Sequence, residues 1–437
     1  MRCMKFFSQL NLKSEIINVL NSLKLKETFE VQEKVISLAL QGKNVVFTSR
    51  TGSGKTLAFT IGFLGKINKK LGIQMIVLVP TRELCIQVGK EISRVAESLG
   101  LSVGMLYGGR EISNDYKTTS KKIHIMIGTP GRLIQHINSK HIKVGDVKLL
   151  VFDESDHMFD DGFFNDCVYV KTRVSKDSQL ILSSATITEK VRKFIEEVIV
   201  NYELLNVGSQ IPRNIFQEKL FCSKSDKNNI MLKLLTERKF QKIVIFCNTK
   251  IKCELIAKFL FDNDFRVRAI SSNLDQNQRL KHLDLFKSDR LQVLVATDIA
   301  ARGLDISELP HVINYDLPNV AADYVHRIGR TGRAGSTGEA VSFVCDEDAE
   351  LLRDVQNLIG EVLERRTVPG FEPDKPLPDF ALNTKPKKIK KPKQPKPASG
   401  QAGQGQKPQQ RRSHNPNQPS GEKANRPRRR SPKKPTV

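Results

Sequence analysis

One stretch of eight residues, Ser49-Arg50-Thr51-Gly52-Ser53-Gly54-Lys55-Thr56, constrains the fold of this 437-residue chain more than any other. An apolar run of strand length, 44–48, comes before it, and a helical pattern starts at Lys55. Because Gly52 and Gly54 have no side chains, backbone N–H groups can close around a phosphate, and the N-terminus of the following helix adds partial positive charge. Lys55 can then reach the outer phosphates, and the Thr56 hydroxyl can ligate Mg²⁺. The context favours a nucleotide-binding loop over a glycine-rich turn that binds nothing, although Ser49 stands where Gly is usual.

Apolar runs of strand length follow this loop and alternate with segments of helical length. They cover residues 74–79, 123–127, 149–152 and 179–182. Continuous apolar strands that alternate with helices are typical of a parallel sheet covered on both faces. Each run ends in polar or small residues, namely 80–83, 128–132, 153–156 and 183–186. Since ligands bind at the carboxyl edge of such a sheet, we expect these clusters to lie beside the phosphate loop.

Asp153 and Glu154 directly follow one of these strands. An Asp at this place can hold Mg²⁺, partly through water, and the adjacent Glu can orient or deprotonate an attacking water molecule. An acidic surface loop is the alternative, and the upstream phosphate loop is what favours the catalytic interpretation.

The alternation lapses near residues 206–214 and then starts again. Further strand-like runs, at 242–247, 265–270, 291–295, 311–315 and 340–344, predict a second parallel sheet without a phosphate loop of its own. The sequence therefore predicts an α/β protein with two tandem domains, 1–207 and 215–367, joined by a linker at 208–214.

The densest basic cluster of the second half is His326-Arg327-Ile328-Gly329-Arg330-Thr331-Gly332-Arg333. Arg327 and Arg330 are three residues apart, so one helical turn places them side by side. Paired guanidinium groups suit the γ-phosphate of a nucleotide held by the first domain. A solvated arginine-rich loop is the alternative.

The end of the chain has a different composition. Of the net charge of +24, residues 385–437 supply +16, from 17 Lys or Arg residues and one acid, and they hold ten of the 19 prolines and no aromatic residue. Such a segment cannot bury enough apolar surface to offset its chain entropy, so 368–437 is predicted to be a disordered basic tail. Its expected partner is a nucleic acid, bound through phosphate contacts, and a purely solubilising tail is the alternative.

Other features limit the class of protein. No apolar run reaches the roughly 18 residues that a membrane span needs, and the N-terminus lacks the apolar region of a signal peptide. The seven cysteines are scattered, with no Cys-x-x-Cys pair, so neither a zinc site nor a disulfide framework is indicated. We expect a cytosolic or nuclear protein without a membrane segment, and take the cytoplasm as its localisation.

With these motifs in order, residues 7 to about 365 resemble the DEAD-box ATP-dependent RNA helicases of helicase superfamily 2. The resemblance implies two RecA-like domains, ATP and Mg²⁺ as ligands, RNA as substrate and ribonucleoproteins as possible partners. It makes residues 7–32 an adenine-recognition motif, in which Phe7 stacks on the base and Gln32 bonds its edge. Periodicity alone favours a core aromatic and a surface amide at these two positions.

The resemblance also assigns roles to individual residues. Lys55, Asp153, Glu154, Arg327 and Arg330 are implied to be catalytic, and Asp305 to meet the ribose. Asp156, Ser184 and Thr186 are implied to couple the state of the nucleotide to RNA separation. The implied RNA-backbone contacts are Pro80, Thr81, Arg82, Gly108, Gly109, Thr129, Pro130, Gly131, Arg132, Thr249, Thr297 and Gly303.

The chain departs from the family pattern at Thr28-Phe29, where Pro-Thr is usual, at Ser155, where Ala is usual, and at Ser271-Ser272-Asn273, where His-Gly-Asp is often found. Two other functions are open at this point: an ATP-dependent RNA clamp or chaperone, and a superfamily 2 DNA translocase.

Overall fold

The computed structural model of the protein describes residues 5–49, 52–207, 214–238, 240, 242–271, 273–301, 306, 309–332, 337–372 and 382. Arg50, Thr51, Gly303 and Asp305 lie outside the described residues. So do residues 208–213 of the predicted linker and, except for Leu382, the predicted tail beyond Glu372.

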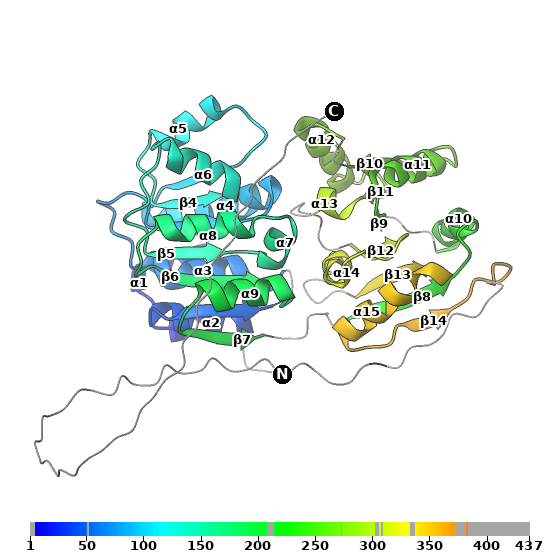
Figure 1. The fold of residues 1–437 in the computed structure, drawn as a ribbon, viewed down its shortest axis with the longest axis horizontal. Helices are drawn as coiled ribbons and strands as arrows, with labels where there is room; N and C mark the ends of the chain where they lie inside the picture. The colour runs from blue at the N-terminus through cyan, green and yellow to red at the C-terminus, as the bar shows by residue number, and fades with distance from the viewer. Residues whose placement is uncertain are drawn as a thin grey trace, which may run out of the picture. The chain divides into compact units, whose positions relative to one another are not determined.

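The first half of the chain folds around a seven-stranded sheet with the order β3-β4-β2-β5-β6-β1-β7 (Figure 1). All its neighbouring strands are parallel. The strands are β1 Asn44–Thr48, β2 Met75–Leu78, β3 Val103–Leu106, β4 Ile125–Gly128, β5 Leu149–Phe152, β6 Gln179–Ser184 and β7 Tyr202–Asn206.

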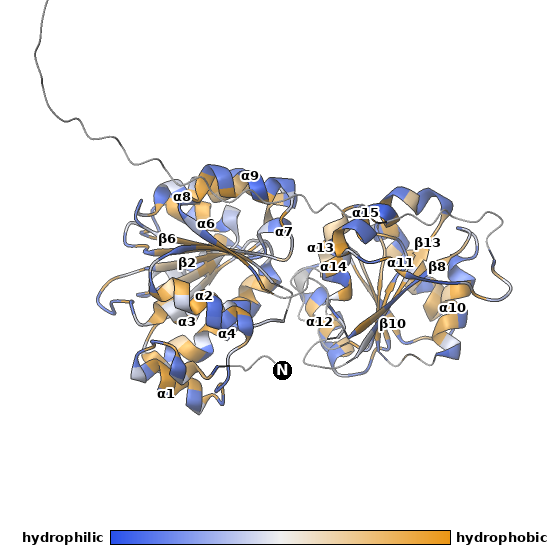
Figure 2. Cartoon of the chain, turned by 90° about the horizontal axis from the view of Figure 1, so that it is seen from below, coloured by the Kyte–Doolittle hydropathy of each residue, from blue (hydrophilic) through white to orange (hydrophobic). Residues whose placement is uncertain are grey.

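Helices cover both faces of this sheet because its strands alternate their side chains between two cores. Val45 and Phe47 of β1 belong to one apolar cluster and Val46 to the other. Figure 2 shows α1–α4 on one side of the sheet and α6, α8 and α9 on the other. The helices are α1 Ser14–Ser22, α2 Glu30–Leu40, α3 Lys55–Leu64, α4 Arg82–Ala96, α5 Tyr116–Thr119, α6 Pro130–Asn138, α7 Ser155–Asp160, α8 Phe164–Arg173 and α9 Glu189–Val198.

The second half repeats this topology. Its seven parallel strands have the order β10-β11-β9-β12-β13-β8-β14, which, counted from its own first strand, is the order of the first sheet. The strands are β8 Ile215–Phe221, β9 Ile243–Phe246, β10 Val267–Ile270, β11 Val293–Ala296, β12 His311–Asn314, β13 Gly338–Val344 and β14 Glu364–Arg366. The helices are α10 Lys227–Glu237, α11 Lys250–Phe261, α12 Gln276–Lys287, α13 Asp298–Ala301, α14 Ala321–Ile328 and α15 Ala349–Ile359.

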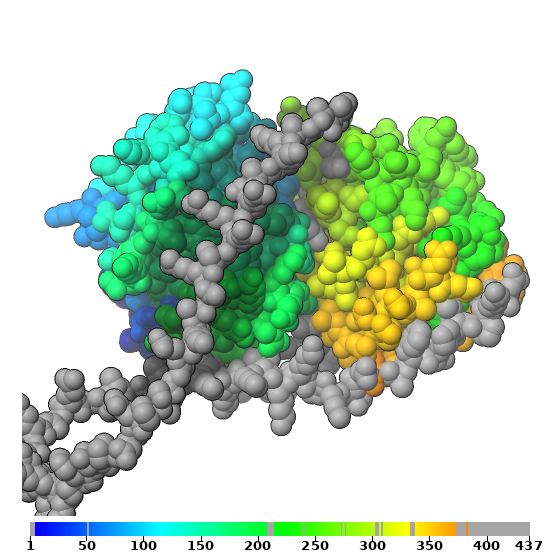
Figure 3. All heavy atoms as spheres, viewed as in Figure 1, coloured from blue at the N-terminus to red at the C-terminus, as the bar shows by residue number. Residues whose placement is uncertain are grey.

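Three apolar clusters stabilise the second sheet. One holds residues of α10 and α11, a second those of α12 and α13, and a third those of α14 and α15. Leu352 and Val355 of α15 pack in the third cluster with Ala340 and Val344 of β13. In the space-filling view α15 (residues 349–359, yellow to orange) lies on the surface of this part of the molecule (Figure 3).

The prediction of two parallel α/β sheets is confirmed. The sequence analysis missed β3, β7, β8 and β14. Of these, β3 and β7 are partly exposed and β14 is wholly exposed, so they lack the continuous apolar run that marks a doubly covered strand. The predicted domain boundaries stay predictions, with β7 ending at Asn206 and β8 starting at Ile215.

Candidate functional site

A cavity of about 360 Å³ lies at the carboxyl edge of the first sheet and brings together many of the predicted site residues. Among those that line it are Phe7, Gln32, Gly52, Gly54, Lys55, Thr56, Asp153, Glu154 and Arg330. These residues come from distant parts of the chain, so the cavity is a product of the tertiary structure.

The described part of the phosphate loop is tightly built. Gly54 precedes α3 with φ +80°, and a Cβ there would lie 2.3 Å from the Gln32 side-chain nitrogen, so only glycine fits. The hydroxyls of Ser49 and Ser53 are 2.7 Å apart, and buried Lys55 donates to the Ser49 carbonyl at 3.4 Å. Ser49 therefore closes the loop by hydrogen bonding where glycine is usual.

Gln32 ties the N-terminal segment to this loop. Its Oε1 accepts from the Phe29 N–H at 2.9 Å, and its Nε2 donates to the Gly54 carbonyl at 3.2 Å. One N–H and one lone pair of the amide are left for a ligand. Phe7 is only 2% exposed and packs in the core, yet it also lines the cavity, so the core interpretation and the base-stacking interpretation are compatible.

The two acidic residues after β5 have different environments. Burial is the main factor that raises the pKa of Asp153 to about 6, with the Glu154 charge adding to it and Lys55 opposing it. Burial also acts to raise the pKa of Glu154, but the hydrogen bond and charge of His157 outweigh it and the pKa falls to about 2. Both carboxylates are thus mostly ionised near neutral pH, but the raised pKa of Asp153 shows that nearby positive groups compensate its charge less well.

Asp156 connects the acidic segment to the segment after β6. Its Oδ2 accepts from the Thr186 N–H at 2.9 Å, from the Thr186 hydroxyl at 2.9 Å and from His326 Nε2 at 3.4 Å. The Ser184 hydroxyl donates to the Thr186 carbonyl at 2.6 Å. Ser155 is fully buried and donates to the Ser183 carbonyl at 3.0 Å, so the serine adds a hydrogen bond that alanine could not make.

His157 is a site residue that the sequence analysis missed. Its ring lies 3.6 Å, centroid to centroid, from the ring of His326, and its Nδ1 is 3.5 Å from Glu154 Oε2. A histidine after an acidic pair has no distinctive pattern of its own, so only the fold could reveal this contact.

The two arginines of the basic cluster lie in different environments. Arg330 lines the cavity together with Lys55 and Glu154. Arg327 is 1% exposed, and its guanidinium is bonded inside the second half to both Asp298 carboxylate oxygens at 2.6 Å and to the Asp316 carbonyl at 2.6 Å. That Arg327 meets a γ-phosphate stays a prediction, and its present partners favour a role in positioning.

Many of the predicted RNA contacts lie at the start of a helix. Thr81, Thr129 and Thr249 are the residues just before α4, α6 and α11, and the hydroxyls of Thr81 and Thr249 each cap a backbone N–H at 3.2 Å. Pro80 precedes Thr81, Pro130 is the first residue of α6, Gly131 follows with open space beside it, and Thr297 precedes α13. Helix N-termini attract phosphate groups, so this arrangement suits a nucleic-acid backbone.

The two predicted arginine contacts of the first half lie in different surroundings. Gly109 has φ +81°, and a Cβ there would overlap the Arg82 guanidinium, so the Arg82 side chain can lie over this residue only because it is glycine. Gly108 has open space beside it. Arg132 is 8% exposed and pairs with the buried Asp115 at 2.6 Å. Arg132 is therefore placed to shape its loop, and a direct RNA contact stays a prediction.

Further residues line the cavity without having been predicted. Phe29 is half exposed at its edge, and Glu91 and Arg94 come from α4. Burial raises the pKa of Glu91, and a hydrogen bond with the Thr56 side chain opposes this shift. Glu91 shares a helix face with Leu84 and Gln87, so helical spacing from the predicted contact segment could have identified it.

Mg²⁺ fits this site in its donor chemistry. The Thr56 hydroxyl and the Asp153 carboxylate line the same cavity, and the raised pKa of Asp153 marks a carboxylate that a divalent cation would stabilise. Among the described residues no group of three or more His, Cys, Asp or Glu side chains forms a metal site. The ion would therefore rely on phosphate and water oxygens as well.

Comparison with known proteins identifies the family. Residues 29–194 match the DEAD/DEAH box helicases, and residues 226–335 match the helicase conserved C-terminal domain. The chain is 36% identical over 373 residues to the DEAD-box ATP-dependent RNA helicase CshA of Geobacillus kaustophilus, covering 84% of this chain and 80% of that protein. This chain belongs to the DEAD-box ATP-dependent RNA helicase family.

The helicase is also 35% identical over 369 residues to CshA of Bacillus subtilis, covering 84% of this chain and 75% of that protein. Among solved structures it resembles Saccharomyces cerevisiae Dbp5 bound to RNA and ADP BeF3, with a TM-score of 0.75 and 28% identity over 83% of this chain and 96% of that one. It is an ATPase that binds ATP and acts on RNA. None of the helices in the described ranges combines the length and apolar character needed to cross a lipid bilayer.

Proposed function

We propose that the helicase couples ATP hydrolysis to closure of its two sheets around one cavity, and that closure bends one RNA strand and forces its partner strand out. One observation carries the proposal: Arg330 of the second half lines the same cavity as Lys55, Asp153 and Glu154 of the first. A nucleotide held there needs groups from both halves, so its binding favours the closed state.

Different residues of the cavity bind different parts of the nucleotide. Phe7 and Gln32 bind the adenine, with Phe7 stacking on the ring and Gln32 using its remaining N–H and lone pair. The loop from Ser49 to Thr56, including Arg50 and Thr51, surrounds the phosphates, and Asp305 meets the ribose. Lys55 neutralises charge on the outer phosphates, and Arg330 stabilises charge that develops during transfer.

Glu154 orients the attacking water molecule through its ionised carboxylate and accepts a proton from it. Thr56 and Asp153 would hold Mg²⁺, partly through water, and the ion when bound would supply charge neutralisation on the phosphate oxygens. Asp153 in turn accepts a hydrogen bond from the Ser183 hydroxyl, which fixes the carboxylate.

Coupling to RNA runs through Asp156, Ser184 and Thr186. Asp156 bonds Thr186 in the first half and His326 in the second, so opening the cavity breaks one side of this network. The ion pair of Arg279 with Glu83, at 3.2 Å, is a second contact that opening would break. Glu83 is next to Arg82, so this contact reaches the predicted RNA surface.

RNA binding uses the backbone-directed contacts already named, on residues 80–82, 108–109 and 129–132 in the first half and Thr249, Thr297 and Gly303 in the second. Contacts of this kind predict little sequence preference. The basic segment 385–437 raises the affinity for RNA electrostatically. We place the activity in the cytoplasm, on ribonucleoprotein substrates.

Steady-state ATP hydrolysis tests the proposal, measured with and without single-stranded RNA, with DNA as the control. The full chain and a chain that ends at Asn383 are compared. If RNA but not DNA strongly stimulates ATP hydrolysis in both chains, the tail contributes only affinity for RNA. If the chain that ends at Asn383 loses the stimulation by RNA, the tail is required for the activity itself.

A second measurement separates hydrolysis from binding. Glu154→Gln should bind ATP and RNA but stall, whereas Glu197→Gln, a change on an exposed face of α9, should turn over normally. Full turnover in Glu154→Gln contradicts the assignment of the base. Absence of RNA stimulation in the unmodified chain favours an RNA clamp, and equal stimulation by DNA favours a translocase.

A further inference from the structure

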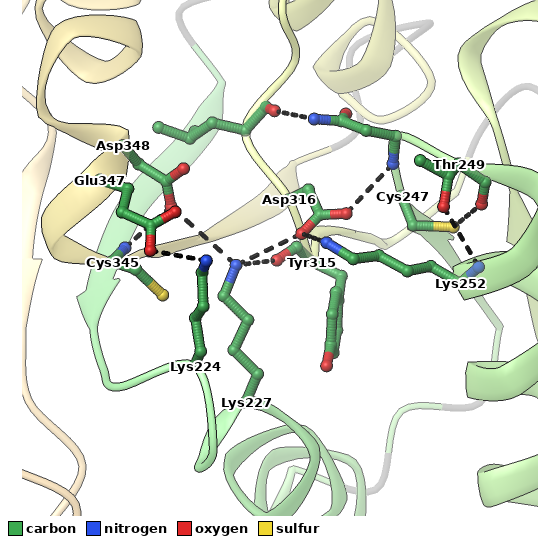
Figure 4. A network of polar contacts seen from close by, with 12 residues as sticks. Lys224, Lys227, Cys247, Thr249, Lys252, Tyr315, Asp316, Cys345, Glu347 and Asp348 are labelled. Atoms are coloured by element: carbon green, nitrogen blue, oxygen red, sulfur yellow. Dashed lines mark hydrogen bonds and ion pairs between the residues drawn. The ribbon is translucent and has the colours of Figure 1, made fainter.

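The second sheet has its own loop at the position that the phosphate loop occupies in the first. β1 ends at Thr48 and α3 starts at Lys55, while β8 ends at Phe221 and α10 starts at Lys227. The loop between β8 and α10, residues 222–226, contains no glycine. Lys227 is buried, donates to the Tyr315 carbonyl at 2.9 Å and lies 3.4 Å from an Asp316 carboxylate oxygen (Figure 4). At this edge of the sheet the lysine is therefore already paired with groups of the protein itself.

Two cysteines end adjacent strands at this edge. Cys222 follows β8 and Cys345 follows β13; the strands are parallel with Phe221 opposite Val344, and the Cys222 N–H donates to the Val344 carbonyl at 3.1 Å. Adjacent strands are about 4.8 Å apart, within the 4.4–6.8 Å between Cα atoms that a disulfide needs. Both thiols are buried in the same apolar cluster, so they lie on one face of the sheet.

The environment of the two thiols differs. The hydrogen bond with Cys222 and the charge of Lys227 lower the pKa of Cys345, against the effect of burial. The hydrogen bond with Cys345 and burial raise the pKa of Cys222. Lys227 also hydrogen-bonds the Cys345 thiol, so Cys345 is assigned as the sulfur that meets the oxidant, and Cys222, which hydrogen-bonds it, as the sulfur that attacks it.

We propose that Cys345 and Cys222 form an oxidant-sensitive pair that a hydroperoxide converts to a disulfide, and that the disulfide lowers RNA-stimulated activity. The Cys345 thiolate attacks one peroxide oxygen, the O–O bond breaks, and hydroxide leaves and takes a proton, which gives a sulfenic acid. The Cys222 sulfur then attacks the Cys345 sulfur, the S–O bond breaks, and water leaves. In total two thiols lose two electrons and two protons, and one hydrogen peroxide becomes two water molecules.

The pair is connected to the predicted RNA surface. Lys227 holds Asp316, whose other carboxylate oxygen accepts from the Asn248 N–H at 3.2 Å, directly before Thr249. The Asp316 carbonyl accepts from Arg327 at 2.6 Å. A disulfide would remove the thiol that Lys227 hydrogen-bonds, so the ammonium and Asp316 would have to readjust, and the start of α11 with them.

The chain offers a matched control pair, Cys247 and Cys253. These thiols are also buried and hydrogen-bonded to each other. Cys253 Sγ donates to the Val295 carbonyl at 3.1 Å, and Cys247 Sγ to backbone carbonyls at 3.7 and 3.8 Å. The hydrogen bond with Cys253 and burial raise the pKa of Cys247, and the cation that opposes them, Arg327, is already bonded to Asp298, so this pair should stay reduced.

The test treats the full chain in its native state with hydrogen peroxide and maps its peptides without reduction. A Cys222–Cys345 cross-linked peptide is expected, with Cys247 and Cys253 still reduced. RNA-stimulated ATP hydrolysis should fall at least about twofold and recover with dithiothreitol, while Cys222→Ser should keep its activity in peroxide and Cys253→Ser should behave like the unmodified chain. Unreacted Cys222 and Cys345, or a cross-link at Cys247–Cys253 instead, would overturn the assignment.

A cross-link that leaves ATP hydrolysis unchanged would overturn the regulatory part of the proposal. Peptide mapping of the unmodified chain needs neither a variant nor helicase activity. Failure of the proposed helicase mechanism is therefore distinguishable from failure of the thiol chemistry.

Discussion

The carboxyl edges of the two sheets share one strand order and yet differ in chemistry. In the first, a loop with two glycines precedes Lys55, and the cavity beside it holds Asp153 after β5. In the second, a loop without glycine precedes Lys227, and Asp316, after the corresponding strand β12, pairs with that lysine. A lysine at the equivalent place and an aspartate soon after the corresponding strand thus line the candidate nucleotide site in one half and form a closed ion pair in the other.

The difference shows that topology alone does not create a phosphate site. Backbone N–H groups must be able to approach the phosphate, which requires glycine, and the lysine must not already be neutralised by the aspartate. The second sheet instead uses its lysine to hold Asp316, and through it Asn248 and Arg327.

The largest expected effect comes from two single variants, in which Lys55 or Lys227 is replaced by glutamine. Lys55→Gln should lower RNA-stimulated kcat about 10³-fold, because the outer phosphates lose their positive partner. Lys227→Gln should keep nucleotide affinity but lower the free energy of unfolding by about 3 kcal/mol, because it breaks a buried ion pair. Nucleotide titration and urea denaturation separate the two results. Weakened nucleotide binding in Lys227→Gln would contradict the comparison.

Arg330 and Arg327 should differ in the same way, with a smaller effect. Arg330→Lys should lower kcat about 10²-fold with little change in Tm, because lysine keeps the charge but not the planar fork. Arg327→Lys should chiefly lower Tm, because it loses the two bonds to Asp298. Single-turnover hydrolysis and thermal unfolding check both. An unchanged Tm in Arg327→Lys would argue against its positioning role.

A substitution at Asp115 tests the buried charge network of the first half, because this carboxylate lies at its centre. Arg132, Arg110 and His136 surround it, and although burial acts to raise its pKa, the bonds to His136 and Arg132 make the net shift downward. Asp115→Asn should cost about 3 kcal/mol of unfolding free energy at pH 7. A lowered folded-state pKa stabilises above the unfolded pKa of about 3.9, so the loss should shrink as the pH falls below about 4.

Urea denaturation at several pH values checks this prediction, with exposed Asp146→Asn as the control. A difference between Asp115→Asn and the unmodified chain that does not change with pH would show that packing, and not charge, sets the cost.

The smallest effect is expected at Ser155. Ser155→Ala restores the usual residue of the family and removes the hydrogen bond to Ser183, so unfolding free energy should fall by about 1 kcal/mol with ATP hydrolysis retained. Ser98→Ala, an exposed change, should have less effect in the same denaturation assay. A large loss of ATP hydrolysis in Ser155→Ala would mean that the serine has a role in the reaction itself.

The sequence by itself determined the two-sheet α/β fold and the family, because doubly covered strands form continuous apolar runs and the phosphate loop is a local motif. It also placed Asp153 and Glu154 at the end of one strand and Lys55 in the loop and helix that follow another, and the parallel topology then brings them to one edge. Short-range patterns sufficed for each of these conclusions.

Only the tertiary structure decided which side chains face the cavity. Arg327 and Arg330 are one helical turn apart, yet one is bonded inside its own half and the other lines the nucleotide cavity. His157, Phe29 and the Cys222–Cys345 pair likewise depend on contacts between distant segments. Burial and ion pairing depend on which strands become neighbours, and a single sequence does not encode that in any local pattern.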